Sequence, residues 1–287
     1  MLIRKIDPYT KCPLNKDGNG NLYSQQGNQR SVYMNYNGSY DFTASKVSIT
    51  NERKYYDRHY KDLTFKKLTL KEIQSPWYDE TMPEHLVLLN SLGDLSGKTV
   101  LLLGNGTSFK EFYFLDLGAR VVYSDISIEA VNYAKELFFH SELQEIRHEN
   151  IEFHAIDALH LPFPDDSFDV IYGYAFVHHI EELEQFFSEV NRCLKKDGIC
   201  RFLDDAYSPI WQFIKNLLLK PLQQYIHKKM EYLRKTKEPQ KEAAIKKRRL
   251  FNICIHLPLE SSYLYVFHFF CAYSEGDSVK FLDGTQR

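Results

Sequence analysis

The central third of the chain alternates short apolar runs with longer amphipathic stretches. The apolar runs cover Thr99–Leu103, Ala119–Tyr123, Ile151–Ile156, Phe168–Tyr174 and Ile199–Leu203. Continuous apolar runs of this kind are typical of strands that are buried on both faces of a sheet. Such strands are parallel, and parallel neighbours need a crossover segment between them. The pattern therefore predicts a parallel β-sheet.

The stretches between these runs predict crossover helices over Ser108–Leu117, Ile128–Phe139 and Glu181–Leu194. Gly118 follows the first helix and Gly198 lies in the turn after the last, as expected where a helix ends. Alternating strands and helices form βαβ units with right-handed crossovers. These units give a doubly wound sheet whose ligand crevice lies at the carboxyl ends of the strands. We therefore predict a Rossmann-like α/β fold.

The flanking segments have different patterns. Residues 10–40 are rich in Asn, Gly, Gln and Ser and predict turns and short strands. Helix is expected in part of the stretch after Asn51 and over Leu86–Leu92. We divide the chain into a small N-terminal flap (1–50), a helical lid (51–97), a ligand-binding core (98–206) and a helical cover with C-terminal strands (207–287).

Composition narrows the class of protein. The 287 residues are 44% hydrophobic, which suits one full α/β domain with additions. The five cysteines form no CxxC pair, which argues against a disulfide framework and against a metal knuckle. The first residues lack the apolar core of a secretory signal, and the longest apolar run, Tyr263–Tyr273, is too short to span a bilayer. We expect a soluble, cytoplasmic protein.

Charge is distributed unevenly along the chain. The net charge is −2, but residues 208–250 carry twelve Lys and Arg against three Glu, a local charge of +9. This segment has the pattern of an amphipathic helix broken at Pro221 and Pro239. An anionic acceptor, an acidic membrane surface or a homodimer interface would each suit it, and a solvated helix face is the alternative. Nucleic acid is not expected, because the remaining residues are acidic and no recognition motif occurs.

Three polar signals follow the predicted strands. Gly104, Asn105 and Gly106 form a glycine turn after the first strand, where backbone can approach a ligand closely. Asp125 ends the second strand about 20 residues later, where a carboxylate can accept the ribose hydroxyls of an adenine nucleotide. Asp157 ends the third strand and could accept the adenine amine. The alternatives are a plain turn at the glycines, a helix cap at Asp125, for which Ser127 is the better candidate, and a turn at Asp157.

The segment LPFPDDSFDVIYGYAFVHHI, residues 161–180, completes the series. The order of glycine turn, strand-end Asp125, Asp157-Ala158 and this segment resembles the class I S-adenosylmethionine-dependent methyltransferases, in particular the ubiquinone/menaquinone-biosynthesis-like (methyltransferase type 11) branch. The resemblance covers about residues 86–205. It implies a doubly wound, mostly parallel seven-stranded sheet and methyl transfer from S-adenosylmethionine to an O, N or C atom of a small-molecule acceptor of natural-product, lipid, quinone or sugar type. It implies S-adenosylhomocysteine as product and no metal.

The resemblance assigns roles residue by residue. Gly104, Asn105 and Gly106 would face the methionine part of the cofactor, and Asp125 would bind the ribose. Ile126 would pack on the adenine, and Asp157 with Ala158 would hold its edge. Tyr174 would lie near the sulfonium and the acceptor, as both a cofactor-binding and a catalytic candidate. Tyr55, with Tyr56 and Tyr60, resembles the aromatic helix that closes over the cofactor in this family; ordinary packing is the alternative.

Two residues depart from the family pattern. Leu102 stands where the family usually carries an acid, and Ser108 replaces the third glycine of the turn. A catalytically silent cofactor-binding or scaffold protein with this fold is therefore the main alternative to an enzyme. An NAD-dependent oxidoreductase is disfavoured by the missing third glycine and by the lack of a Tyr-x-x-x-Lys pair.

His178 and His179 follow the fourth strand, where substrate is expected. An imidazole suits proton removal from a hydroxyl or amine acceptor, so both are catalytic candidates; a cap of the next helix is the alternative. Asp204 and Asp205 end the fifth strand and could order an acceptor or lie in a solvated turn. Residues 207–250 follow that strand directly and are predicted to form a roof over the acceptor site.

The N-terminal flap resembles a zinc ribbon that precedes some methyltransferases of this family. The positions of its four thiolate ligands correspond here to Cys12, Asn15, Tyr23 and Gln26. One thiolate cannot hold a structural zinc ion, which needs a tetrahedral set of ligands. We predict a metal-free flap, and an accidental likeness is the alternative.

Overall fold

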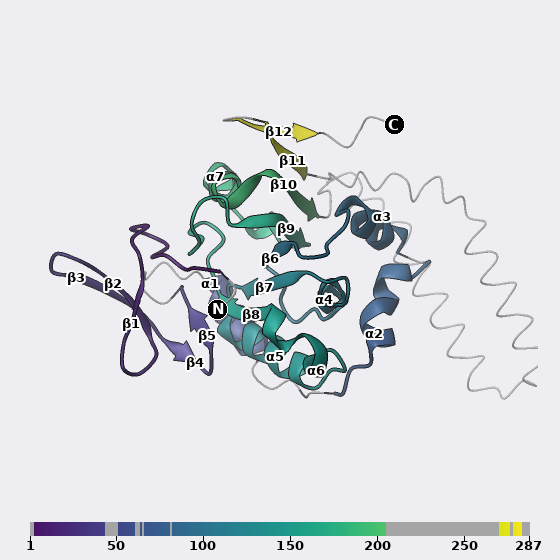
Figure 1. The fold of residues 1–287 in the computed structure, drawn as a ribbon, viewed down its shortest axis with the longest axis horizontal. Coiled ribbons are helices and arrows are strands. Elements are labelled where there is room, and N and C mark those ends of the chain that lie inside the picture. Colours follow the sequence, from purple (N-terminus) through teal and green to yellow (C-terminus); the bar gives the residue numbers. More distant parts are fainter. Residues whose placement is uncertain are drawn as a thin grey trace, which may run out of the picture. The chain divides into compact units, whose positions relative to one another are not determined.

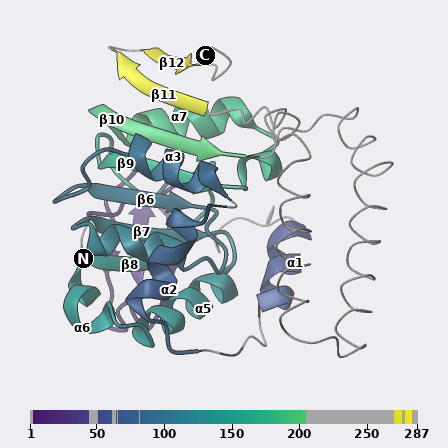
Figure 2. The same cartoon turned by 90° about the vertical axis from the view of Figure 1, so that its right-hand side faces the viewer.

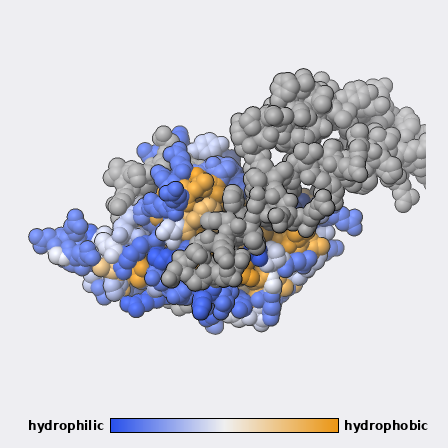
Figure 3. Space-filling view, turned by 90° about the horizontal axis from the view of Figure 1, so that it is seen from above, coloured by the Kyte–Doolittle hydropathy of each residue, from blue (hydrophilic) through white to orange (hydrophobic). Residues whose placement is uncertain are grey.

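The computed structural model describes residues 3–43, 51–60, 64, 66–80, 82–204, 270–275 and 278–282. All of them belong to one compact unit. The predicted roof and the basic stretch 208–250 lie outside the described residues. Within the described part of the chain, no helix is long and apolar enough to cross a membrane. The face shown in Figure 3 is largely hydrophilic where it is described, with its apolar surface in separate patches.

A mostly parallel β-sheet runs through the unit (Figures 1 and 2). Five parallel strands form its centre: β6 (Thr99–Leu103), β7 (Arg120–Asp125), β8 (Ile151–Ala155), β9 (Phe168–Tyr174) and β10 (Leu194–Leu203). Their order is β10-β9-β6-β7-β8. Antiparallel β11 (Phe270–Glu275) and β12 (Ser278–Leu282) extend it beyond β10. These seven strands confirm the predicted doubly wound, Rossmann-like sheet.

The N-terminal flap adds two strands that the sequence did not predict as part of this sheet. β5 (Ser39–Asp41) pairs in parallel with β8, and β4 (Asn35–Tyr36) pairs with β5, so the described sheet has nine strands. A second, three-stranded sheet is formed by β1 (Asn15–Lys16), β2 (Leu22–Gln26) and β3 (Gln29–Tyr33). The turns and short strands predicted for residues 10–40 are confirmed.

Three predicted elements keep their bounds, and the others begin or end at different residues. β6, β9 and helix α5 (Ile128–Phe139) match residue for residue, and Ser127 caps α5 by accepting a hydrogen bond from the amide of Ala130 at 3.1 Å. The helix predicted over Ser108–Leu117 is shorter, with 3-10 helix η2 (Lys110–Phe112) leading into α4 (Tyr113–Asp116). Ser108 instead closes a turn onto the carbonyl of Asn105. β10 begins early, because Leu194 pairs with Phe168 before a register shift.

Helices cover one face of the sheet with aromatic side chains. They are α2 (Leu70–Gln74), η1 (Ser75–Tyr78), α3 (Pro83–Ser91), η2, α4 and α5, and the short α6 (Gln144–Arg147) and η3 (His148–Asn150) lead into β8. Trp77 and Phe114 pack on Tyr172 with ring centroids 6.3 and 5.4 Å apart, and Phe112 packs on Tyr123 at 5.9 Å. These side chains are almost fully buried. These aromatic side chains therefore form a hydrophobic core between the helices and this face of the sheet.

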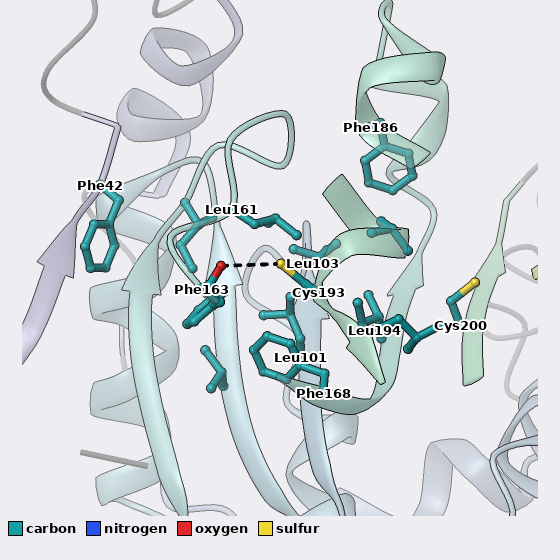
Figure 4. Packing of buried hydrophobic residues seen from close by; sticks show 14 of the residues in the cluster. Phe42, Leu101, Leu103, Leu161, Phe163, Phe168, Phe186, Cys193, Leu194 and Cys200 are labelled. Atoms are coloured by element: carbon teal, nitrogen blue, oxygen red, sulfur yellow. Dashed lines mark hydrogen bonds between the residues drawn. The ribbon is translucent and has the colours of Figure 1, made fainter. Parts of the chain in front are cut away.

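The opposite face is covered by α7 (Leu183–Cys193) and by the N-terminal flap. Figure 4 shows Phe186 and Cys193 of α7, Phe42 of the flap and Leu101 of β6 in one apolar cluster. The connection from β8 to β9, residues 156–167, contains no helix although all of its residues are described. A parallel crossover usually carries a helix over the sheet. Here the flap supplies cover on this face.

Candidate active site

A cavity of about 740 Å³ lies at the carboxyl ends of the parallel strands. The cavity is lined by Leu103 at the end of β6 and Gly104 directly after it, by Asp125 at the end of β7, by Asp157 after β8 and by Ala175 after β9. Its volume falls within the roughly 300–1,000 Å³ of small-molecule pockets. Strand-end residues meet here because the strands are parallel and adjacent. The structure thus places a cavity where the topology predicts a ligand crevice.

The glycine turn lies directly against this cavity. Gly104 and Gly106 have φ angles of +60° and +55°, which other residues rarely adopt. A side chain at Gly104 would also place its Cβ 2.4 Å from Cγ of Phe176, whereas the space at Gly106 is limited only by the hydroxyl of Tyr60 at 3.4 Å. Backbone, and not side chain, therefore faces the cavity at this turn.

The carboxylate of Asp125 forms the centre of the site. One oxygen accepts a hydrogen bond from the amide of Gly106 at 2.7 Å and the other from the amide of Ser127 at 2.9 Å. Burial raises the pKa of Asp125 to about 6, and the nearby carboxylate of Asp57 acts in the same direction. The protein thus holds a desolvated anion at the end of β7, which can still accept hydrogen bonds on its remaining lone pairs.

The segments that follow β7 and β8 supply the other predicted contacts. Ile126, Asp157 and Ala158 line the cavity, as the sequence suggested for the adenine end. One oxygen of Asp157 accepts from the amide of Leu159 at 2.9 Å, and the other lies 2.8 Å from Nδ1 of His160. The His160 ring is in turn 3.1 Å from the amide nitrogen of Gln185. Asp157 is thereby fixed in orientation.

The lid helix α1 (Asn51–Tyr60) presents a different tyrosine from the one expected. Tyr56 and Tyr60 line the cavity and stack at 5.8 Å, whereas the side chain of Tyr55 is 59% exposed and does not line it. Residues four apart share one face of a helix, and Tyr55 is turned by one residue from that face. Burial raises the pKa of Tyr60 to about 12, so its hydroxyl remains protonated at neutral pH.

Ion pairs fix this helix beside the site. Arg53 of α1 bonds Asp41 of β5 at 2.6 Å and Asp57 at 3.3 Å. Asp57 accepts a hydrogen bond from the hydroxyl of Ser127 at 2.6 Å, next to Asp125. Figure 2 shows α1 on the side toward which the β10 arrow points. The flap, helix α1 and the carboxylate of Asp125 are therefore linked by one polar network.

Two residues that were predicted to contact the cofactor do not line the cavity. The amide of Asn105 donates to the carboxylate of Glu111 at 3.3 Å, and only its backbone belongs to the turn. Tyr174 lies outside the cavity lining, with its ring 3.8 Å from Nζ of Lys110 and 5.2 Å from the ring of His85. Side chains alternate along a strand, so Tyr174 shares the face of Tyr172. The structure does not bring Tyr174 to the cavity.

Glu111 is a buried acid that the sequence analysis missed. It is fully buried behind the glycine turn, and its carboxylate also accepts from the hydroxyls of Ser108 at 2.6 Å and Tyr172 at 3.3 Å. Nζ of Lys110 lies 3.2 Å away. Leu102, which stands at the family's acid position, is itself fully buried. In the sequence, the available signal for this residue was its position three residues after Ser108 of the glycine turn.

The two histidines have different surroundings. Nδ1 of His178 lies 2.6 Å from one oxygen of Asp204, and the His178 amide donates to the other oxygen at 2.9 Å. His179 lines the cavity, with Nε2 3.4 Å from the hydroxyl of Tyr56. The two rings are 4.0 Å apart. Asp204 therefore both caps the short helix η4 (Val177–His179) and orients a histidine beside the cavity; Asp205 lies outside the described residues.

Two of the four flap positions that correspond to zinc-ribbon ligands are joined by a side-chain hydrogen bond. The side-chain amide of Gln26 donates to Sγ of Cys12 at 2.8 Å, and Tyr23 packs under Arg30 at 4.5 Å. Among the residues that the structure describes, no group of three or more His, Cys, Asp or Glu could hold a metal ion. Polar contacts stand here at positions that the resemblance assigns to zinc ligands.

Comparison with known proteins agrees with the strand-end chemistry. Residues 101–202 match a family model described as a methyltransferase domain. Over 111 residues the chain is 37% identical to the uncharacterized methyltransferase YcgJ of Bacillus subtilis, covering 38% of this chain and 41% of that one. Over 126 residues it is 28% identical to the demethylmenaquinone methyltransferase of Streptomyces griseus, covering 43% and 50%. The chain thus spans half or less of the length of these relatives.

Solved structures include similar chains. The crystal structure of the Bacillus subtilis YcgJ protein is similar with a TM-score of 0.39 and 28% identity, over 46% of this chain and 55% of that one. A methyltransferase from Haloferax volcanii, solved in complex with the activator Trm112, has a TM-score of 0.42 and 21% identity, over 55% and 65%. The matched region contains the glycine turn, Asp125 and Asp157. The family model and the sequence relatives thus identify residues 101–202 as similar to a methyltransferase domain, in agreement with the resemblance to the class I S-adenosylmethionine-dependent methyltransferases.

Proposed function

We propose that this protein transfers a methyl group from S-adenosylmethionine to a small-molecule acceptor. The observation that carries the proposal is the buried carboxylate of Asp125, held at the edge of one cavity by the amide of Gly106 in the glycine turn and by the amide of Ser127. The residues fit an adenosyl cofactor. Asp125 offers an anionic acceptor for a ribose diol, Ile126 and Ala158 offer apolar surface for a purine, and Asp157 offers an acceptor for its amine.

The cofactor supplies an activated methyl group on a sulfonium, so the protein needs mainly to align the partners and exclude water. Tyr56 and Tyr60 of the lid and Phe176 after β9 line the cavity and would exclude water. Phe176 packs so closely on Gly104 that the turn and the end of β9 are fixed relative to each other. These residues provide alignment rather than chemical groups.

His178 is the proton acceptor in this proposal; it is not itself in the cavity lining, and its ring lies 4.0 Å from that of His179, which is. Because Asp204 engages Nδ1, the neutral ring carries its proton there and leaves the Nε2 lone pair available. Such a base would take the proton of a hydroxyl or amine acceptor as the methyl group is transferred. His179, whose Nε2 lies near the hydroxyl of Tyr56, would orient the lid rather than act as the base.

The names of the relatives support a small-molecule acceptor. They include a demethylmenaquinone methyltransferase, a sterol 24-C-methyltransferase and phosphoethanolamine N-methyltransferases. Each of those names describes that protein and covers only part of this chain. The shared feature is a small organic acceptor. The proposed acceptor is accordingly a small molecule of lipid, quinone, sugar or natural-product type.

Transfer of tritium from methyl-labelled S-adenosylmethionine tests this proposal. The full chain is incubated with three separate fractions of a cell extract: small molecules, protein and RNA. Label is expected in the small-molecule fraction, and the Asp125→Asn protein is expected to transfer much less. Label that enters only protein or RNA would refute the small-molecule assignment.

A catalytically silent cofactor-binding protein is the second candidate. It is favoured by Leu102, a buried leucine at the position of the family's acid. It predicts that the chain binds S-adenosylhomocysteine and transfers no label to any fraction. The buried carboxylate of Glu111 behind the same turn favours the enzyme, because it keeps an anion near the place where the acid is missing.

A further inference from the structure

The cavity is closed at its β8 end by the N-terminal flap. Tyr9 and Thr43, both outside the matched methyltransferase region, line the cavity together with Asp157 and His160. The Tyr9 ring packs on the His160 ring with centroids 4.7 Å apart and planes at 46°. His160 in turn is held by Asp157 at 2.8 Å. An aromatic pair from two distant parts of the chain thus stands at the end assigned to the adenine.

A tight loop fixes the position of Tyr9. Asp7 is fully buried, and one of its oxygens accepts hydrogen bonds from the amides of Tyr9 at 3.0 Å and Thr10 at 2.8 Å. Its other oxygen accepts from the hydroxyl of Ser24. The Lys11 amide closes the loop onto the Asp7 carbonyl at 2.9 Å. These hydrogen bonds fix the backbone of Tyr9, and the packing on His160 positions its ring.

The flap itself is part of the folded core. Leu22, Tyr33, Tyr40 and Phe42 belong to the same apolar cluster as the strands of the large sheet. The amide of Ile6 donates to the carbonyl of Pro162 at 3.0 Å, just after His160. Buried Lys5 pairs with Glu152 of β8. The flap therefore carries Tyr9 on a fixed base and not on a loose arm.

We propose that Tyr9 is a purine-binding residue and that the N-terminal flap is an integral part of the cofactor site. The Tyr9 and His160 rings form the end wall against which an adenine base packs, opposite Ile126. The ligand class is an adenosine moiety, free or as part of S-adenosylmethionine. This inference rests on the proposed function, since it assigns the adenine to the β8 end of the cavity. It gives the N-terminal flap a role in binding and specificity.

Isothermal calorimetry on the full chain tests this with S-adenosylhomocysteine and adenosine as probes. Tyr9→Ala is expected to weaken both probes by the same factor, about 5- to 150-fold, because loss of an aromatic face under a base costs that much. Tyr9→Phe keeps the face and should stay within about twofold of the natural protein. The matched control is Tyr36→Ala, which removes a 44% exposed tyrosine of the same flap that does not line the cavity.

Four outcomes are distinguished by these measurements. Equal losses for both probes, at an unchanged melting temperature, support the proposal; if Tyr9→Ala fails to fold, Tyr9→Leu keeps apolar bulk and should show the same losses. Unchanged affinities in a folded Tyr9 variant would overturn it, as would a loss for S-adenosylhomocysteine without a loss for adenosine. If the natural protein binds neither probe, the proposed function fails instead.

Discussion

Replacing Asp125 by asparagine tests whether its carboxylate binds the cofactor or only stabilises the fold. The pKa of Asp125 is raised from 3.8 to about 6, chiefly by burial. A raised pKa means that the ionised carboxylate costs the folded protein free energy above about pH 6, and that this cost disappears below about pH 3.8. About two pKa units correspond to about 3 kcal/mol at neutral pH. Asp125→Asn removes this cost.

The same substitution also loses a hydrogen bond. An asparagine oxygen can accept from Gly106 or Ser127, but its amino group would face the other amide. A buried donor left without a partner costs about 1–3 kcal/mol. Gain and loss nearly cancel, so the free energy of unfolding of the ligand-free protein should change by no more than about 2 kcal/mol.

Cofactor affinity should respond much more strongly. Hydrogen bonds from a ribose diol to a charged acceptor contribute about 1.5–3 kcal/mol, so S-adenosylhomocysteine should bind about 10- to 150-fold more weakly. Calorimetry and thermal unfolding at pH 7.5 give both quantities. The control is Asp94→Asn, an exposed turn carboxylate that also accepts a backbone amide, from Ser96 at 2.9 Å. A folded Asp125→Asn protein with unchanged affinity but clearly lower stability would refute the binding role.

Three further predictions use other residues. The affinity for S-adenosylhomocysteine should fall as the pH drops from 7 to 5, because Asp125 protonates near pH 6, and Asp125→Asn should show a flat profile; equal profiles would contradict this assignment. Gly104→Ala should lower the melting temperature more than Gly93→Ala, since both glycines have positive φ but only Gly104 faces Phe176; equal losses would show that the contact relaxes. Burial lowers the pKa of His154 to about 4, below its unfolded value, so stability is lost as the pH falls from 6.5 toward 4. The His154→Asn protein, whose side chain can still accept a hydrogen bond from the amide of Tyr40, should lose less stability over this range. Thermal unfolding measured as a function of pH tests this, and a slope equal to that of the natural protein would contradict it.

The sequence predicted the sheet well because its information is local. A buried parallel strand is a continuous apolar run, so β6 and β9 could be bounded from hydrophobicity alone. The strand-end carboxylates followed from order along the chain. Asp125 and Asp157 meet at one cavity because parallel neighbours end at one edge.

Side-chain direction was harder to predict. A strand that is apolar on both faces gives no sign of which face each residue takes, so Tyr174 was expected at the cavity and lies on the other face. In α1 the run of charged and aromatic residues sets no clear helical phase, which is why Tyr55 was chosen and Tyr56 and Tyr60 line the cavity. A shift of one residue along the helix decides whether a tyrosine faces the cavity or the solvent.

Contacts between distant segments could not be predicted. Tyr9 meets His160 only because the flap covers a crossover without a helix, and no pattern within residues 1–43 indicates that partner. The contact arises from tertiary packing. Glu111 differs, because its partners Ser108 and Asn105 lie within six residues of it, so its spacing from Ser108 was a local signal.

The most direct test of the central claim is calorimetric titration of the purified full chain with S-adenosylhomocysteine and, separately, with NAD at pH 7.5. The glycine turn and strand-end carboxylate of Asp125 are features that both ligands could use, whereas the missing third glycine at Ser108 disfavours the dinucleotide. The account predicts one S-adenosylhomocysteine bound per chain and no heat from NAD. Binding of NAD without binding of S-adenosylhomocysteine would contradict it.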